Sequence, residues 1–422
     1  MSCLDGSRGA LRALTDLLSH ADDSVVVGAV DAAHALPSIE RCADVTALRA
    51  VVPLPTDTAA RARVAAIETR LAEAKAFADT GQWTEARRRI VPIVEDARTA
   101  GYEPLLADAL DARAWLEGQL GDPAASVKTQ EEALWVALAT HRDDVAAESA
   151  TELMAITAYY LARPEESRRW ELLAEALQGR LGPGHERIAA WFHQALGLAR
   201  QGQGDYRRAA AEFDLARTLK EKVLPPNHPD IALTLRALSN AQLEIGEGAQ
   251  ALTAAQKAVD IDRAAYGSGS PLLWGALDDL GEVFESLHRY REAEEVLRSS
   301  VDLVVAFVGA DHAWTGFPLT ALGKTLLAEG KYREAVPVLE RAQRAREHAT
   351  LGADLVAETR FALARARWAL NRDRPGSLAL ASAARDAYRK LPGQEKRTEE
   401  IEVWLADRVE HSPHRDSSRH GD

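Results

Sequence analysis

The tripeptide His141-Arg142-Asp143 is the part of the sequence that comes nearest to a catalytic motif. In phosphoryl transfer, the aspartate of such a tripeptide accepts the proton of the attacking hydroxyl, and an asparagine five residues later holds a metal ion. Here the residue five positions after Asp143 is Glu148, and no Asp-Phe-Gly follows. A second copy, His414-Arg415-Asp416, has no glycine-rich phosphate loop upstream either. We interpret both tripeptides as solvated charges, at a helix end and in a tail.

Other residues with possible chemistry have simpler explanations. The segments Gly202-Gln203-Gly204 and Gly267-Ser268-Gly269 have no strand before them, so turn formation explains them. Three histidines recur between helical segments, where we expect structural contacts that close loops rather than metal binding: His185, His228 and His312. The nine tryptophans, among them Trp83, Trp274 and Trp314, are expected to pack in cores and loops. We predict no catalytic residue, no metal site and no cofactor.

The cysteine content and the hydropathy suggest a compartment. Cys3 and Cys42 are the only cysteines, too few for a disulfide framework and without the spacing of a zinc site. We expect both to be ordinary buried or half-buried thiols in a reducing environment. No stretch approaches the roughly 20 apolar residues of a membrane helix, and the first residues lack the pattern of a signal peptide. These features predict a cytoplasmic protein with no membrane partner.

Composition and length favour an elongated helical array. The 422 residues are 46% hydrophobic and 27% charged, with a net charge of -13. This balance excludes a disordered or collagen-like chain, and the acidity argues against nucleic-acid binding. Single cores rarely exceed roughly 250–300 residues, so the chain needs several domains or an array of small units. Alanine, the best helix former, is the commonest residue, and this predicts an all-α protein.

A repeat of 42 residues organises the chain. A leucine followed by a small residue recurs at Leu196-Gly197, Leu238-Ser239, Leu280-Gly281 and Leu322-Gly323. An alanine follows each pair at Ala209, Ala251, Ala293 and Ala335, and turn residues lie between them at Gly204, Gly246, His288 and Gly330. Weaker copies upstream place Ala86, Ser126 and Ser167 in the same frame, at steps of 40, 41 and 42 residues before Ala209. Each unit therefore predicts two helices joined by a tight turn, in which the small residues let the helices approach closely.

This pattern resembles the tetratricopeptide repeat, and the 42-residue form with a Gly-x-x-His-Pro link resembles the repeats of kinesin light chain and its bacterial relatives. The resemblance implies an all-α, right-handed superhelical solenoid of helix hairpins, with about eight repeats over residues 64–392. Residues 395–409 predict a polar capping helix with Ile401, Val403, Trp404 and Leu405 on its inner side, within a capping segment over 393–410. Residues 411–422 are expected to form a disordered tail.

The segment before the array looks like a connector. Residues 8–20 and 23–36 predict two short amphipathic helices, followed by a proline-rich stretch around Pro53 and Pro55. Residues 1–57 resemble the connector between the catalytic domain and the tetratricopeptide array of myxobacterial-type serine/threonine protein kinases. The resemblance implies the detached regulatory half of such a kinase or a stand-alone descendant.

The resemblance also implies a binding groove lined by the first helix of each pair. By position, it assigns eight residues to this groove: Gln194, Leu198, Arg236, Asn240, Asp278, Glu282, Thr320 and Lys324. Their charges alternate, which would suit an extended peptide of mixed charge. The alternative for each residue is a solvated helix face.

Two hypotheses for function follow. The first is a non-catalytic scaffold that binds a protein or peptide segment in the groove, in bacterial signalling. The second is the regulatory region of a serine/threonine kinase whose catalytic domain is absent from this chain. Self-association through the terminal repeats is a third possibility, which a polar capping helix would oppose.

Overall fold

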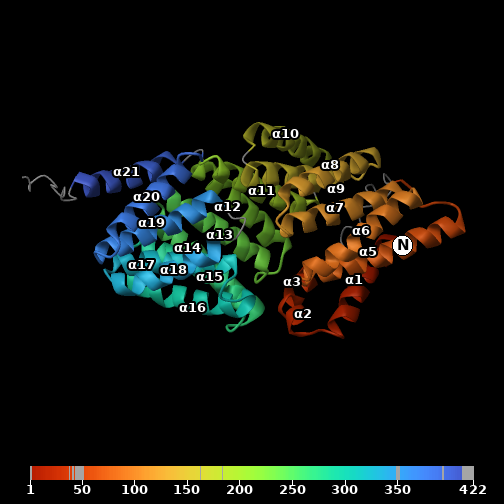
Figure 1. Cartoon of the computed structure of the whole chain (residues 1–422). Helices are drawn as coiled ribbons and strands as arrows, with labels where there is room; N and C mark the ends of the chain where they lie inside the picture. The colour runs from red at the N-terminus through yellow and green to blue at the C-terminus, as the bar shows by residue number, and fades with distance from the viewer. Residues whose placement is uncertain are drawn as a thin grey trace, which may run out of the picture. The chain divides into compact units, whose positions relative to one another are not determined.

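The computed structural model describes residues 2–37, 39, 42, 52–161, 163–182, 184–347, 352–391 and 394–410. In these ranges every regular element is helical, and successive helices form hairpins, so the predicted all-α fold class is confirmed (Figure 1). The chain divides into two units, residues 1–270 and 271–422. The division lies inside the predicted array, at the glycine-rich link before Pro271.

The described residues of the first unit form three N-terminal helices and five helix pairs. The N-terminal helices are α1 (Ser2–Leu18), α2 (Asp23–Val27) and α3 (Ala29–His34). The pairs are α5 (Thr58–Asp79) with α6 (Trp83–Ala100), α7 (Glu103–Gln119) with α8 (Pro123–Ala139), α9 (Asp143–Ala155) with α10 (Pro164–Leu181), α11 (Glu186–Gly202) with α12 (Tyr206–Val223), and α13 (Pro229–Glu244) with α14 (Gly248–Tyr266). A π-helical turn, η2 (Ile156–Tyr160), continues α9. The first helices of successive pairs contact one another, α5 with α7, α7 with α9 and α9 with α11.

The second unit contains three pairs and a last helix. The pairs are α15 (Trp274–Ser286) with α16 (Tyr290–Val308), α17 (Gly316–Ala328) with α18 (Tyr332–Glu347), and α19 (Ala353–Ala369) with α20 (Arg374–Tyr388). The 3-10 turns η3 (Pro271–Leu273) and η4 (Ala313–Thr315) precede α15 and α17. The last helix is α21 (Glu395–Glu410), whose Ile401 and Leu405 are buried with Phe361 and Tyr388. The expectation that Val403 also faces inward is wrong, because its side chain is 64% exposed.

The turns inside the pairs follow the predicted residues. Gly204, Gly246 and Gly330 have positive φ angles, which glycine adopts without the steric cost that a Cβ brings. His288 holds the corresponding position with φ +58. The next helix begins directly after each turn. At α12, for example, the carboxylate of Asp205 caps the helix by accepting a hydrogen bond from the Arg208 backbone amide. The sequence therefore places each helix reversal correctly.

Close helix contacts depend on small residues at the predicted positions. A Cβ added to Gly197 would lie 2.5 Å from the Phe213 ring, and Gly281 and Gly323 have the same relationship with Leu297 and Leu339. The alanines of the second helices, Ala209, Ala251, Ala293 and Ala335, are completely buried. Glycine and alanine thus leave room on one helix for a large side chain from its partner, as predicted.

The prediction of two free thiols is wrong, because Cys3 and Cys42 form a disulfide with their Cα atoms 5.6 Å apart. Sequence spacing alone could not show that the start of α1 meets Cys42, eight residues past the end of α3. The helix bounds also differ from the expected ones, since α1 begins at Ser2 and a break at Gly28 separates α2 from α3. Most of the stretch before Pro53 and all of the predicted tail over 411–422 lie outside the described residues.

Candidate functional site

A pocket of about 350 Å³ lies in the first unit, on the face formed by the first helices of successive pairs. Residues of α5, α7, α9 and α11 line it, and α12 and α13 close one end. Its apolar wall includes Ile90, Leu116, Ile188 and Leu224. Two tryptophans also line it: Trp115, which is 39% exposed, and the half-buried Trp191. The volume and the mixture of aromatic and charged groups are typical of ligand-binding sites.

The walls from α5, α7 and α9 carry carboxyl groups. Asp79, Asp111, Glu148 and Glu152 all line the pocket. Loss of water around the carboxyl, together with the nearby Asp111 and Asp144, raises the pKa of Glu148 to about 8. Desolvation followed by Asp111 raises the pKa of Glu152 to about 7, and desolvation raises that of Asp79 to about 6. Carboxyl groups are therefore crowded here, and the nearby Lys75 and Arg142 do not offset the effect of burial on Glu148.

The opposite end of the pocket carries cations. Lys220 of α12 is almost completely buried, and its ammonium group donates to Gln194 Oε1 and, at 3.1 Å, to the Asp230 carbonyl. Desolvation lowers the pKa of Lys220 to about 8, and the charge of Arg187 adds to this shift. Asp230 partly compensates for the two cations. The pocket thus has an acidic wall from α5, α7 and α9 and a basic end from α11 and α12.

Helix α3 lies against both ends of the row of helices that carries this pocket. At α5, a Cβ on Gly28 would collide with the Thr80 backbone, so the two backbones touch. At α13, the rings of His34 and His228 pack with their centroids 4.2 Å apart. The hydroxyl of Tyr266, the last residue of α14, donates to the Asp31 carboxylate. We call α3 with these contacts the strap.

Four of the sequence-predicted site residues lie in the first unit, and none of them lines the pocket. Gln194 is buried, and its side-chain oxygen accepts from Lys220 and, at 2.7 Å, from the Thr234 hydroxyl. Leu198 packs against the buried cluster around Phe213. Arg236 and Asn240 are half-buried on α13.

The other four lie in the second unit. Asp278 and Thr320 are buried, and the Thr320 hydroxyl pairs with that of Thr359 at 2.9 Å. Lys324 and Glu282 are half-buried neighbours, and Lys324 Nζ lies 2.8 Å from Glu358 Oε1. Lys324 therefore has an internal anion that the sequence pattern did not indicate. The assignment of all eight residues to a binding groove stays a prediction.

Several residues that line the pocket occupy the repeat positions of the predicted groove residues Gln194 and Leu198, in units one to three places upstream. Subtracting 42 from Gln194 gives Glu152, and subtracting 41 more gives Asp111. The same steps from Leu198 give Ile156 and Trp115, and a further 40 residues give Lys75. Sequence reasoning missed these residues because it assigned groove positions only in the four strongest copies of the repeat. The signal was present in the spacing of the weaker ones.

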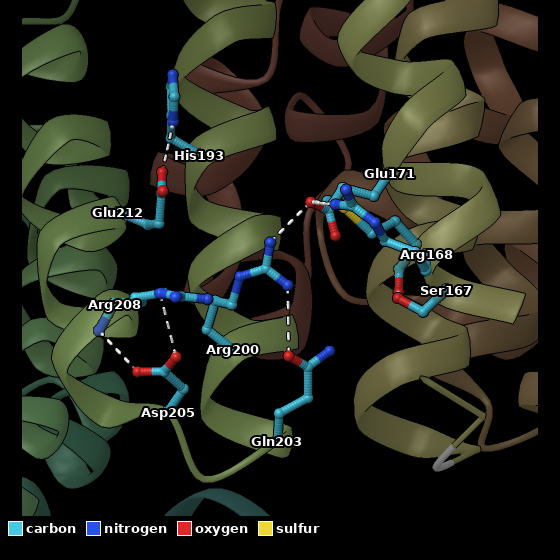
Figure 2. Close-up of polar contacts among 10 residues, drawn as sticks. Ser167, Arg168, Glu171, His193, Arg200, Gln203, Asp205, Arg208 and Glu212 are labelled. Atoms are coloured by element: carbon cyan, nitrogen blue, oxygen red, sulfur yellow. Dashed lines mark hydrogen bonds and ion pairs between the residues drawn. The ribbon is translucent and has the colours of Figure 1, made fainter. Parts of the chain in front are cut away.

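Polar contacts also join α9, α10, α11 and α12 through residues that do not line the pocket. Figure 2 shows Glu171 of α10 with Arg168 of the same helix and with Arg200 of α11, whose Nη2 lies 2.7 Å from the Glu171 carboxylate. Farther along α11, His193 Nδ1 lies 2.7 Å from Glu212 of α12. Ser167 donates to the Met154 carbonyl of α9 at 3.0 Å. These contacts join adjacent helices.

The histidine-containing tripeptide is a helix reversal. His141 has a positive φ, and Arg142 precedes α9, where it pairs with Asp108 at 3.1 Å and Asp144 at 3.0 Å. It lies at a helix end as predicted, but Arg142 is mostly buried rather than solvated. The second tripeptide lies outside the described residues. His228 and His312 accept hydrogen bonds from the backbone amides of Asp230 and Trp314, which confirms a structural role in closing loops.

Two kinds of feature are absent from the described ranges. No group of three or more histidine, cysteine, aspartate or glutamate side chains there is arranged to hold a metal ion. No helix there combines the length and the apolar character needed to cross a membrane.

Comparison with known families gives one match, to the model of the tetratricopeptide repeat, over residues 187–264 and 273–348. These two segments are tetratricopeptide repeats. The matched repeats cover α11 to α14 and α15 to α18, so the helix pairs around them extend the same hairpin pattern. No curated protein sequence matches the chain.

Solved structures give the same fold. The tetratricopeptide repeat sensor protein of the signal transduction ATPase class from Pyrococcus horikoshii is 14% identical, with 95% of this chain and 55% of that chain covered and a TM-score of 0.54. NprR in complex with its cognate peptide NprX is 12% identical, with 71% and 86% covered and a TM-score of 0.51. A protein from Podosopora anserina with nearly identical kinesin light chain TPR-like repeats is 20% identical over 49% of this chain and 98% of that chain, with a TM-score of 0.39.

Proposed function

We propose that this protein is a non-catalytic scaffold that binds a segment of a partner protein in the pocket of the first unit. The observation that carries the proposal is the pocket itself, which combines two accessible tryptophans with an acidic wall and a basic end. Two features support a peptide occupant. Tetratricopeptide repeats are present, and NprR, which has the same fold, was solved with a cognate peptide.

Peptide binding explains why the charges stay open to the pocket. An extended segment can place successive side chains against aromatic and charged groups along one helical face, and charge-assisted hydrogen bonds then give specificity.

The cellular location of the protein is a separate proposal. A cytoplasmic protein is expected from hydropathy, whereas the disulfide between Cys3 and Cys42 is unusual in a reducing compartment.

The role in bacterial signalling and the link to a serine/threonine kinase are finer proposals that rest on the resemblance of residues 1–57 alone. If the chain is non-catalytic, the purified protein with ATP and magnesium transfers no phosphate to itself or to a generic substrate. Autophosphorylation that survives Asp143→Asn would contradict the non-catalytic proposal and show that another residue acts.

Two tryptophans offer a matched test of the proposed groove. The full chain is incubated with an array of random synthetic ten-residue peptides, and the affinity of the best binders is measured in solution. Trp115→Ala, in the pocket, should weaken binding about tenfold or more, because buried aromatic contacts dominate such interfaces. Trp135→Ala, a 57% exposed tryptophan outside the pocket, should leave binding unchanged. Equal effects of the two variants, or no bound peptide at all, would contradict the proposal.

A further inference from the structure

We infer that the pocket selects a peptide with a lysine or arginine side chain, held by the acidic wall of Asp111, Glu148 and Glu152, and with a carboxylate directed toward Lys220 and Arg187. This inference rests on the proposed function, because it names the chemistry of the segment that the same pocket takes. It concerns five side chains of α7, α9, α11 and α12. None of these five side chains was assigned to a groove by the repeat resemblance.

The arrangement of charge carries the first step. Four carboxyl groups line the walls from α5, α7 and α9, and the cations that act on Glu148 are Lys75 and Arg142. Asp111 already accepts a hydrogen bond from Gln130 at 2.8 Å, yet no cation contacts the Glu148 or Glu152 carboxylate within ion-pair distance among the described residues. A guanidinium or ammonium group from a partner would supply the missing positive charge in a site where water is partly excluded.

The opposite end of the pocket carries the second step. Lys220 is almost completely buried, and its hydrogen bonds go to neutral oxygens of Gln194 and of the Asp230 backbone. Arg187 is exposed beside it and lines the same pocket. A carboxylate of the partner, on a side chain or at its C-terminus, would therefore find two cations there, against the single carboxylate of Asp230 that already acts on Lys220. The two ends together favour a segment with both charges over one that is uniformly basic.

Two tryptophans lie near the charged groups of the pocket. Trp115 of α7 lies one helical turn from Asp111, and Trp191 of α11 lies one turn from Arg187. Each tryptophan thus sits beside one charged end. An apolar or aromatic side chain between the two charged residues of the peptide would pack against them, and a guanidinium stacks well on an indole face.

The number of protons released on peptide binding is a measurable quantity. It would not change if Glu148 and Glu152 had a purely structural role. Glu148 and Glu152 hold protons near neutral pH, since their pKa values are about 8 and about 7. Binding of a cation favours the ionised carboxyls, so binding near pH 7 should release protons. The affinity for the basic side chain should rise by about tenfold between pH 6 and pH 8.5, while the preference for a carboxylate should weaken as pH passes about 8, where Lys220 loses its charge.

The experiment uses the full chain and an oriented library of ten-residue peptides in which one position is fixed in turn to each amino acid. Wild-type protein should enrich lysine and arginine at one fixed position, and aspartate, glutamate or a free C-terminus at another. The double variant Glu148→Gln with Glu152→Gln should lose the basic preference about tenfold and flatten the pH dependence. Arg187→Gln should weaken only the acidic preference. Glu175→Gln, an exposed glutamate on α10 outside the pocket, is the matched control.

The outcomes separate this inference from the proposed function. If peptides bind without a basic preference, or the preference and the pH dependence survive in the double variant, the inference is overturned while groove binding stands. If basic peptides bind but the selection of acidic residues survives Arg187→Gln, the second half alone is overturned. If wild-type protein binds no peptide, both the inference and the proposed function fail. Calorimetry in two buffers of different ionisation enthalpy measures the released protons directly.

Discussion

The imidazole ring of His34 on α3 packs against that of His228 at the start of α13, with ring centroids 4.2 Å apart and planes inclined by 53°. Two charged imidazoles at this distance would repel each other. His228 Nδ1 also accepts the Asp230 amide hydrogen bond at 3.1 Å, which requires an unprotonated nitrogen. The strap therefore depends on a neutral His228.

The first prediction concerns the pH dependence of this contact. Desolvation lowers the pKa of His228, the positive charges of His34, Arg187 and Lys220 lower it further, and Asp230 opposes them. Because the folded state favours neutral His228, its contribution to stability is complete above the ordinary pKa of about 6.5 and is lost as pH falls through the lower folded value. His228→Asn keeps a capping oxygen without the titration. Wild-type melting temperature should therefore fall relative to His228→Asn between pH 7.5 and pH 5.

Asp31, which accepts from Tyr266 in the same strap, has a raised pKa through desolvation and titrates in both proteins. Comparison of the two proteins thus isolates His228. Parallel melting curves across this pH range would show that the imidazole contact contributes nothing to stability.

The second prediction concerns the disulfide between Cys3 and Cys42. A cross-link over this separation stabilises by about 2–4 kcal/mol, mainly through the unfolded state. Reduction should increase amide hydrogen exchange in α1 and in the strap more than in α13. Cys3→Ser, Cys42→Ser and the double variant should behave alike, because each removes the same bond. Native protein that reacts with a thiol reagent without prior reduction would contradict the pairing.

The third prediction concerns helix packing at Gly323 and Leu339. A Cβ at position 323 would overlap the Leu339 side chain, so Gly323→Ala should cost about 1–3 kcal/mol. Leu339→Ala alone should cost about 2–5 kcal/mol, because its side chain is completely buried. The double variant should cost less than the sum, since the new methyl group occupies the vacated space. Chemical denaturation measures all three.

Gly6→Ala serves as the control for this pair. Nothing lies within 4 Å of a Cβ there, so the change should stabilise α1 by about 0.5–1 kcal/mol. Additive costs at positions 323 and 339 would contradict the close approach of α17 and α18.

The fourth prediction concerns Glu148 and stability at high pH. Its raised pKa, to about 8, means that the folded state holds a proton that the unfolded chain has lost above about pH 4.5. This glutamate therefore lowers stability progressively as pH rises from about 4.5 to 8. Glu148→Gln should raise the melting temperature at pH 9 and leave it nearly unchanged at pH 4.5. Glu175→Gln, measured in parallel, should show no such difference.

The fifth prediction concerns the pair of Glu171 and Arg200, whose side chains are 8% and 16% exposed. Removal of one partner leaves an uncompensated charge in the contact between α10 and α11. Glu171→Ala should therefore destabilise by about 3–5 kcal/mol, and the double variant with Arg200→Met should recover part of this loss. If the double variant recovers no stability, the loss caused by Glu171→Ala comes from its other contact, Arg168 (Figure 2).

The helix pairs and their close packing follow from local features of the sequence. Local rules set these features: apolar residues at helical spacing, glycine at positive φ in Gly204 and Gly330, and small residues opposite Phe213 and Leu339. Each rule acts within one repeat of about 42 residues, so a single sequence is enough to read it.

The pocket, the strap and the disulfide depend on contacts between residues that are distant in sequence, so the tertiary structure was needed to find them. Asp111, Glu152 and Lys220 belong to different repeats, and His34 meets His228 only because the repeats between them curve back on the N-terminal helices of the same unit. The burial that shifts the pKa values of Glu148 and Lys220 depends on the sum of those inter-repeat contacts. Side chains distant in sequence gain their chemistry from neighbours that no local pattern specifies.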